Sequence, residues 1–448
     1  MKGVLVLRIK RSLNENWTFI KQEGSLEDIL SMTGETIQLP HAWNEPDALK
    51  NGKAFVKGAF WYKKTIDVFI NPEKKYFLEF EGVSHFANVY VNGSLAAHHQ
   101  GGFSTFRVEI TDFVKNGENV IAIEVDNQKK DTTFSQTADL TFLGGIYRSV
   151  TFIEIEVTHL RLKHHGGLGF TVTPTLNEDG TANVRMESWI ANGEGIFVTY
   201  KITDHTGRVI AVKDAPSDDT VLTLKVKKPH LWNGVEDPYL YTATASLMVN
   251  ETCVDTVSTR FGIRSYEIDA EKGFLLNGKP YELHSTAHSD THLDLGWSAT
   301  ADDHINTMNK LKEAGINTIQ LTHYQHYQYF YDLCDECGMI VWSEIPFASL
   351  FGNSEETHEG TISQMTELVI QNYNHPSICF WSIFNEIDID HDKHPKFLEC
   401  LKDLHSMINT LDPTRPTAII NTETPSVNGD SIQTRDALAC ELFQSVFR

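Results

Sequence analysis

One glutamate is a candidate proton donor. Glu386 follows Ser377-Ile-Cys-Phe-Trp-Ser-Ile-Phe, an almost unbroken apolar run that predicts a buried strand. A carboxyl group that emerges from an apolar wall is partly kept in its neutral form, because desolvation disfavours the charged form. Such a group can give its proton to a leaving-group oxygen near neutral pH. The neighbouring Asn385 offers an amide that could orient a ligand hydroxyl, while a carboxylate in a surface ion pair is the alternative interpretation of Glu386.

Other ionisable side chains follow three further expected strands, at 281–284, 317–321 and 339–342. They are His284, His288 and Asp290 after the first, His323 after the second and Glu344 after the third. The carboxyl ends of parallel strands meet at one mouth of a barrel, and catalytic groups gather there. Each residue alone could be merely solvated or structural, but together they predict one site.

The elements that would position these residues begin at about residue 273. Short apolar runs alternate there with amphipathic helices, expected at 302–314, 327–337, 361–373 and 395–411. This alternation predicts parallel strands with crossover helices. Six strands can be counted, with 417–420 as the fifth, if 437–443 is the last, so we expect an incomplete (β/α)8 barrel.

Two β regions precede the expected barrel. The first 150 or so residues contain period-2 stretches separated by turn signals such as Asn92-Gly93, which predict a β-sandwich. The second region, from about residue 150 to 266, suits an immunoglobulin-like sandwich of about 100 residues. We therefore expect domains at 1–154, 155–266 and 267–448.

Composition excludes several classes of partner. The chain has 448 residues with 60 Asp and Glu against 38 Lys and Arg, a formal charge of −22 that argues against a nucleic-acid partner. No segment approaches the length of a membrane span, and the first residues lack a secretory pattern, so we expect a cytoplasmic protein without membrane contact. None of the six cysteines lies in the first 250 residues, which favours reduced thiols, and we expect Cys334 and Cys337 to be ordinary helix side chains.

Several motifs resemble glycoside hydrolase family 2, the family of β-galactosidases and β-glucuronidases. In chain order they are Asp139-Leu-Thr-Phe-Leu-Gly-Gly-Ile-Tyr-Arg148, Leu231-Trp232, Pro238-Tyr-Leu-Tyr241, Phe261-Gly-Ile-Arg264, Gly273-Phe-Leu-Leu-Asn-Gly-Lys-Pro280, Gln371-Asn-Tyr-Asn-His-Pro-Ser-Ile and Trp381-Ser-Ile-Phe-Asn-Glu386. The resemblance implies a jelly-roll sugar-binding domain, an immunoglobulin-like sandwich and a TIM barrel, in agreement with the three regions predicted from the sequence patterns.

The resemblance also implies roles for individual residues. Glu386 occupies the general acid/base position of a retaining mechanism, and Asn385 the position that contacts the sugar 2-hydroxyl. Asp139 falls where the first domain reaches the barrel mouth to bind the glycone, and His323 matches a histidine near the substrate. His288 and Trp381 are further candidates for substrate binding. Glu344 matches a carboxylate that binds magnesium in some relatives, so we expect no required cofactor, with Mg or Na as the candidate ions.

The sequence departs from the family at the second catalytic carboxylate. A retaining glycosidase needs a nucleophile about 5–5.5 Å from the acid/base, and the family carries it on the seventh strand, a position that we do not find in these residues. The matching position for an arginine that would keep the nucleophile ionised is Gln320, and that for a tyrosine near it is Phe443. Glu423 and Glu441 lie in the right region without a matching motif.

Two functions from different classes follow. The first is hydrolysis of β-galactoside-like substrates, weak or absent in this chain alone because the nucleophile would have to come from elsewhere. The second is non-catalytic carbohydrate binding on a degenerate hydrolase scaffold, with Trp43, Trp61, Trp297 and Trp381 as candidate stacking residues. Because an unfinished barrel leaves strand edges to be covered, we also expect a homo-oligomer or a complementing C-terminal segment.

Overall fold

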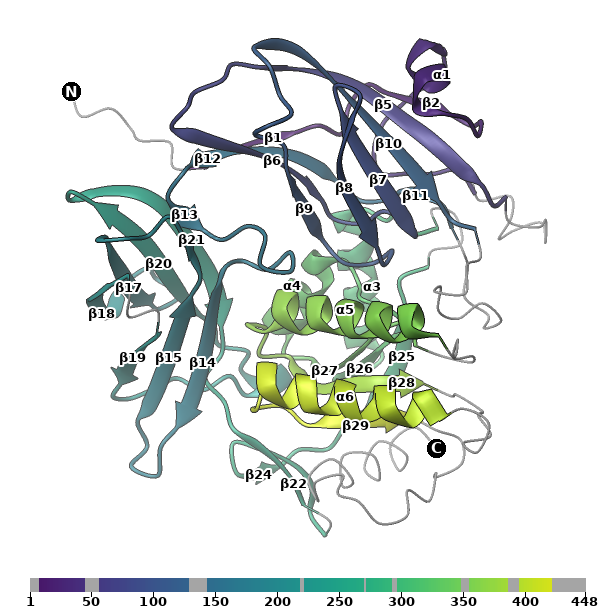
Figure 1. Cartoon of the computed structure of the whole chain (residues 1–448). Helices are drawn as coiled ribbons and strands as arrows, with labels where there is room; N and C mark the ends of the chain where they lie inside the picture. The colour runs from purple at the N-terminus through teal and green to yellow at the C-terminus, as the bar shows by residue number, and fades with distance from the viewer. Residues whose placement is uncertain are drawn as a thin grey trace.

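The computed structural model describes eight stretches of the chain. They are residues 8–44, 56–128, 143–217, 221–269, 271–291, 296–347, 354–385 and 395–420. Three bodies follow one another along the chain, as Figure 1 shows. Within the described residues, no helix combines the length and the apolar character that a membrane crossing requires.

The first body is a jelly-roll sandwich of two antiparallel sheets, with orders β1-β12-β6-β9 and β3-β2-β5-β10-β7-β8. Its elements are β1 (Arg8–Ser12), β2 (Trp17–Ile20), α1 (Leu26–Ser31), β3 (Glu35–Ile37), β4 (His41–Ala42), β5 (Ala59–Val68), β6 (Lys74–Phe80), β7 (Phe86–Val91), β8 (Ser94–Gln100), β9 (Phe106–Glu109), β10 (Gly117–Asp126), β11 (Gly145–Ile146) and β12 (Val150–Glu156). The period-2 pattern is realised in β10, where Ile121, Ile123 and Val125 face the core between the sheets.

The second body is an immunoglobulin-like sandwich with sheets β14-β15-β19 and β18-β17-β20-β21. Its elements are β13 (His159–Leu160), β14 (Phe170–Leu176), β15 (Ala182–Ser188), β16 (Ile190–Ala191), β17 (Phe197–Thr203), β18 (Val209–Pro216), β19 (Val221–Val226), η1 (Gly234–Glu236), β20 (Tyr241–Val249) and β21 (Thr252–Phe261). Val184 and Met186 of one sheet and Val198 and Tyr200 of the other share the core.

The third body is a parallel sheet of the TIM-barrel type with order β25-β26-β27-β28-β29. Its elements are β22 (Tyr266–Asp269), β23 (Gly273–Leu276), β24 (Lys279–Pro280), β25 (Ser285–Ser289), α3 (Ala301–Glu313), β26 (Thr318–Thr322), α4 (Gln328–Cys337), β27 (Ile340–Glu344), α5 (Glu355–Asn372), β28 (Ile378–Asn385), α6 (Pro395–Leu411) and β29 (Thr417–Ile420). Helices α5 and α6 cover the sheet face that is nearest the viewer in Figure 1.

The helix predictions are correct in place and less accurate at the ends. Helix α6 has the expected bounds, whereas α5 begins at Glu355, six residues earlier than expected. Its first turns are polar, and the Ser354 side chain caps them by accepting a hydrogen bond from the Thr357 backbone N–H. The periodicity of apolar residues does not reveal such a start.

The prediction of the first parallel strand at 281–284 is wrong. The structure places β25 at Ser285–Ser289, where it pairs in parallel with Thr318–Thr322. Residues 281–284 precede the strand, so His284 lies at its amino end and His288 within it. The polar sequence of β25 hides this strand from a search for apolar runs. The expected strand at 437–443, with Phe443, lies outside the described residues.

Polar side chains hold the three bodies together. The Gln371 amide of α5 donates to the carbonyl oxygens of Thr105 (2.9 Å) and His165 (2.8 Å) and accepts from the Thr105 N–H. Arg148 donates to the carbonyl oxygens of Phe103 (2.7 Å) and Gln325 (3.1 Å). The first sandwich is therefore joined to the barrel by buried, directional bonds as well as by apolar contacts.

Candidate active site

The inner face of the parallel sheet carries the candidate site. Ile319, Leu321, Val341 and Trp381 pack toward the helices, whereas Trp342 packs on the opposite face against the three-stranded sheet β22-β23-β24. Side chains alternate along a strand, and Gln320 is paired with Trp342 across β26 and β27. Gln320 and Glu344 therefore share the inner face with Trp342.

Glu344, at the end of β27, is buried, and both of its carboxylate oxygens have partners among the described residues. Its Oε2 accepts a hydrogen bond from Gln320 Nε2 at 3.1 Å, and its Oε1 lies 2.9 Å from His323 Nδ1. The side chain of Glu344 is 1% exposed and that of His323 is 32% exposed. The pair thus connects the sheet interior to a partly open histidine just beyond β26.

Two central predicted residues lie outside the described residues. These are Glu386, the expected acid/base, and Asp139, the expected glycone ligand. The backbone of Asn385 is the last of β28 and pairs with Ile420. Because β27 and β28 are parallel neighbours, with Glu344 paired to Ser382, this strand end lies at the same edge of the sheet as Glu344.

His288 is directed away from the inner face. Its ring stacks on Phe330 of α4, with centroids 4.8 Å apart, and lies 5.4 Å from the ring of His326. Phe330 belongs to the cluster between the sheet and the helices. We therefore leave His288 out of the proposed substrate site.

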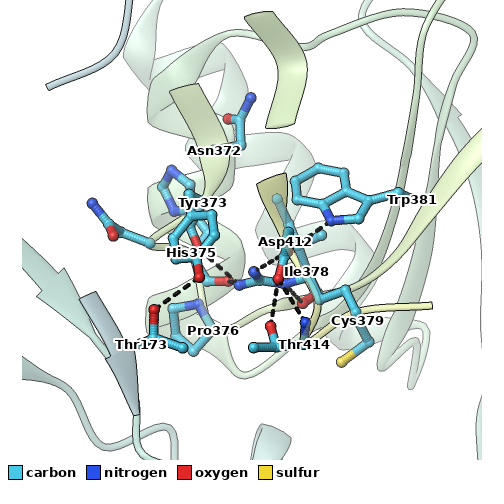
Figure 2. Close-up of polar contacts among 12 residues, drawn as sticks. Thr173, Asn372, Tyr373, His375, Pro376, Ile378, Cys379, Trp381, Asp412 and Thr414 are labelled. Atoms are coloured by element: carbon cyan, nitrogen blue, oxygen red, sulfur yellow. Dashed lines mark hydrogen bonds and ion pairs between the residues drawn. The ribbon is translucent and has the colours of Figure 1, made fainter. Parts of the chain in front are cut away.

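Trp381 is a core residue in the structure. It is fully buried on the helix side, and its Nε1 donates to Asp412 Oδ2 at 2.9 Å. Arg415 Nη1 donates to the same oxygen at 2.6 Å, and Figure 2 shows the indole directed at this carboxylate. The prediction that Trp381 contacts a sugar receives no support from this position.

The other tryptophans named as stacking candidates are also buried. Their exposed fractions are 5% for Trp43, 2% for Trp61 and 3% for Trp297. Trp297 packs with Phe103, Tyr147 and Tyr324 in a cluster between the jelly-roll and the barrel. These residues stabilise domain contacts and cores, and we do not assign them to sugar binding.

One buried ion pair near the mouth was not predicted. Arg148 Nη2 lies 3.6 Å from Asp290 Oδ2, and both side chains are almost fully buried. Burial raises the pKa of Asp290 to about 6, although the positive charge of Arg148 opposes the shift. Asp290 follows β25, and Arg148 ends the motif that contains Asp139. The sequence therefore indicated both residues but did not predict their contact.

Metal ligation by Glu344 finds no support among the described residues. Two groups there have the spacing of a metal site, His288 with Asp290 and His326, and Asp332 with Asp335 and His375. Glu344 belongs to neither group, and its oxygens already contact Gln320 and His323. Cys334 is buried and Cys337 half-buried on α4, and neither belongs to these groups. Mg and Na therefore remain predictions from resemblance.

Three family models match the chain in order. They are the sugar binding domain of glycosyl hydrolases family 2 at residues 30–155, the glycosyl hydrolases family 2 domain at 168–264 and the family's TIM barrel domain at 267–447. Similar curated proteins include a β-glucuronidase of Bacteroides fragilis, 32% identical over 93% of this chain and 61% of the relative, and a β-galactosidase of Thermoanaerobacter pseudethanolicus, 28% identical over 92% of this chain and 54% of the relative.

Solved structures give the same result. An FMN-binding β-glucuronidase from Facaelibacterium prausnitzii L2-6 has a TM-score of 0.88 and 36% identity over 94% of this chain and 65% of that chain. A Bacteroides uniformis β-glucuronidase has a TM-score of 0.84 and 26% identity over 92% of this chain and 52% of that chain. The chain spans less than two thirds of the length of each of these relatives. With all three of its domain models matched in order, the chain belongs to glycoside hydrolase family 2.

Proposed function

We propose that this chain carries the glycone-binding and acid/base part of a retaining β-glycosidase, with β-glucuronides preferred to β-galactosides. The observation that carries the proposal is the Glu344–His323 pair, which lies at the sheet edge where Asn385 ends β28. The preference for a glucuronide rests on the relatives, because the most similar curated protein quoted above and both solved structures are β-glucuronidases.

In the proposed reaction, the carboxyl group of Glu386 gives its proton to the glycosidic oxygen as the bond to the anomeric carbon breaks. Asn385 and Asp139 hold the sugar, and His323 contacts it from the end of β26. A second carboxylate must attack the anomeric carbon at the opposite face of the ring. We assign that role to no residue of this chain, so we expect turnover by this chain alone to be weak or absent.

Turnover of p-nitrophenyl β-D-glucuronide and β-D-galactoside by the purified chain tests the proposal. We expect a higher kcat/KM for the glucuronide and loss of turnover in Glu386→Gln. A higher kcat/KM for the galactoside would reverse the proposed preference. Calorimetric binding of D-glucuronic acid, with no cleavage even when azide is supplied as an external nucleophile, would instead support the carbohydrate-binding alternative. Neither binding nor turnover with any β-glycoside would contradict both.

A further inference from the structure

The pair formed by Glu344 and His323 supports an inference about how the site is organised. We propose that Glu344 is a positioning residue that fixes the ring orientation and the protonated nitrogen of His323, so that its Nε2 meets the substrate. This inference rests on the proposed function only where it names the substrate. The orientation itself can be measured without any turnover.

The hydrogen-bonding capacity of the two side chains sets the direction of the bond. In the proposed arrangement Glu344 is a carboxylate, which only accepts hydrogen bonds, so the imidazole nitrogen that faces its Oε1 at 2.9 Å carries the hydrogen. That nitrogen is Nδ1. The ring nitrogen that can meet a ligand is then Nε2, as an acceptor in neutral imidazole and as a donor in imidazolium.

Gln320 completes the arrangement from the neighbouring strand. Its Nε2 donates to Glu344 Oε2 at 3.1 Å, so each carboxylate oxygen has a described donor. The Gln320 side chain is itself buried, with 5% of the residue exposed. Because the amide holds one oxygen in place, the carboxylate has little freedom to turn away from His323.

The exposed fractions of the Glu344 and His323 side chains indicate which of the two can contact a ligand. Only 1% of the Glu344 side chain is exposed, against 32% of the His323 side chain. A ligand at the mouth can therefore touch His323 while Glu344 remains behind it. This contrast favours a positioning role for Glu344 over direct binding.

The chain contains a matched control at the other end of the sheet. Asp335 Oδ2 lies 2.6 Å from His375 Nδ1, and its Oδ1 accepts a hydrogen bond from the Ser377 N–H. This pair has the same chemistry, with side-chain exposures of 13% for His375 and 2% for Asp335, but it lies before β28 instead of at the ends of β26 and β27. His375→Gln should therefore remove the histidine of a buried carboxylate–histidine pair without altering the candidate site.

The first experiment is nitrogen-15 NMR of the full chain with labelled histidine, with the His323 signals assigned from His323→Gln. We expect Nδ1–H in the wild type, and the same form in Glu344→Gln, whose amide oxygen can still accept. Glu344→Leu should give a mixture of both ring forms. An unchanged His323 spectrum in Glu344→Leu would overturn the inference, whatever the outcome for the proposed function.

The second experiment is a double-mutant cycle read out as the dissociation constant for D-glucuronic acid. We expect about tenfold weaker binding in Glu344→Leu and in His323→Gln, little further loss in the double variant, and recovery of most of the affinity in Glu344→Gln. His375→Gln should bind as the wild type does. Additive losses would show that Glu344 acts independently of His323 and would overturn the inference. Absence of binding by the wild type would instead contradict the proposed function.

Discussion

At the scale of single residues, the barrel depends on buried carboxylates that each have a defined partner. Asp412 is the clearest example, because it accepts hydrogen bonds from Trp381 Nε1 and Arg415 Nη1. Arg415 also donates to the carbonyl oxygens of Tyr373, His375 and Ile378. One ion pair thus joins the end of α5 to the starts of β28 and β29.

Replacing Asp412 with asparagine should therefore destabilise the barrel strongly. Removing one partner of a buried pair leaves the other charge uncompensated, at a cost of about 3–5 kcal/mol. The pairing with Arg415 also holds the pKa of Asp412 below its usual value, against the opposing effect of burial. The contribution of the Asp412 carboxylate to the free energy of unfolding is therefore present above the ordinary aspartate pKa and is lost as the pH falls through the lowered pKa.

Urea denaturation followed by tryptophan fluorescence tests this prediction at pH 7 and at acid pH. The matched control is Asp179→Asn, which removes an exposed carboxylate paired with Lys225 and should leave the midpoint unchanged. Equal midpoints for Asp412→Asn and the wild type would contradict the assigned role.

Asp290 should show the opposite pH dependence. Its folded-state pKa is raised to about 6 by burial, so the unfolded state ionises first as the pH rises from about 4. Between pH 4 and pH 6 the ionisation of Asp290 favours the unfolded state, so the free energy of unfolding decreases. The decrease is complete above pH 6 and amounts to about 1.4 kcal/mol for each pH unit between the two pKa values. Asp290→Asn cannot ionise, so its stability relative to the wild type should increase between pH 4 and pH 6. Thermal unfolding at several pH values measures the difference, and a constant difference would refute the prediction.

At the scale of elements, patterns of residues predicted the sequence of strands and helices well. The alternation of apolar runs and amphipathic helices predicted four of the five described parallel strands and all four large helices. The first strand was misplaced because Ser285-Thr-Ala-His-Ser289 has no apolar run and is a strand only through its pairing with β26. Contacts between elements, such as Arg148 with Asp290 and Gln320 with Glu344, could not be predicted because they depend on register and packing.

Two glycines at helix ends allow a matched test of packing between elements. Gly315 and Gly338 follow α3 and α4, and both have φ of +75°. A Cβ at Gly315 would meet no atom within 4 Å, whereas one at Gly338 would lie 2.1 Å from the carbonyl oxygen of Gly234. Gly234 belongs to η1, so this close approach seats the second body on the barrel.

The two alanine variants should therefore differ in stability. Gly315→Ala should cost about 1–2 kcal/mol, the usual strain of a left-handed conformation. Gly338→Ala carries the same strain and a clash with backbone, so its loss should be clearly larger. Equal losses in chemical denaturation would show that the Gly234 contact contributes nothing to stability.

At the scale of the whole molecule, hydrogen bonds join both β-sandwiches to the barrel. Gln371 and Arg148 hold the jelly-roll sandwich to the barrel. The convergence of strand ends predicted one group of polar side chains, and two members of that group, Glu344 and His323, lie 2.9 Å apart in the structure. Roles for Asp139, Asn385 and Glu386 remain predictions.

The edges of the parallel sheet lead us to expect that this chain associates with another polypeptide. Within the described residues, the outer strands β25 and β29 each pair with one neighbour only. Parallel edges of this kind are usually covered, so we expect a homo-oligomer or binding of a complementing segment. Light scattering coupled to size-exclusion chromatography should give a mass above the 50.7 kDa of one chain. A monomer that also fails to bind added barrel segments would contradict this expectation.

Proton donation by Glu386 is tested most directly by the dependence of glycoside cleavage on the leaving group, with azide supplied as the external nucleophile. Azide would attack the anomeric carbon while Glu386 protonates the departing oxygen, which yields a glycosyl azide and a phenol. Loss of general acid catalysis typically slows cleavage by about 10²–10⁴-fold. We therefore predict that Glu386→Gln slows cleavage of phenyl β-D-glucuronide by that order and hardly affects the 2,4-dinitrophenyl substrate, whose leaving group needs no proton. Equal rates for the variant and the wild type with the phenyl substrate would show that Glu386 does not donate the proton to the leaving group.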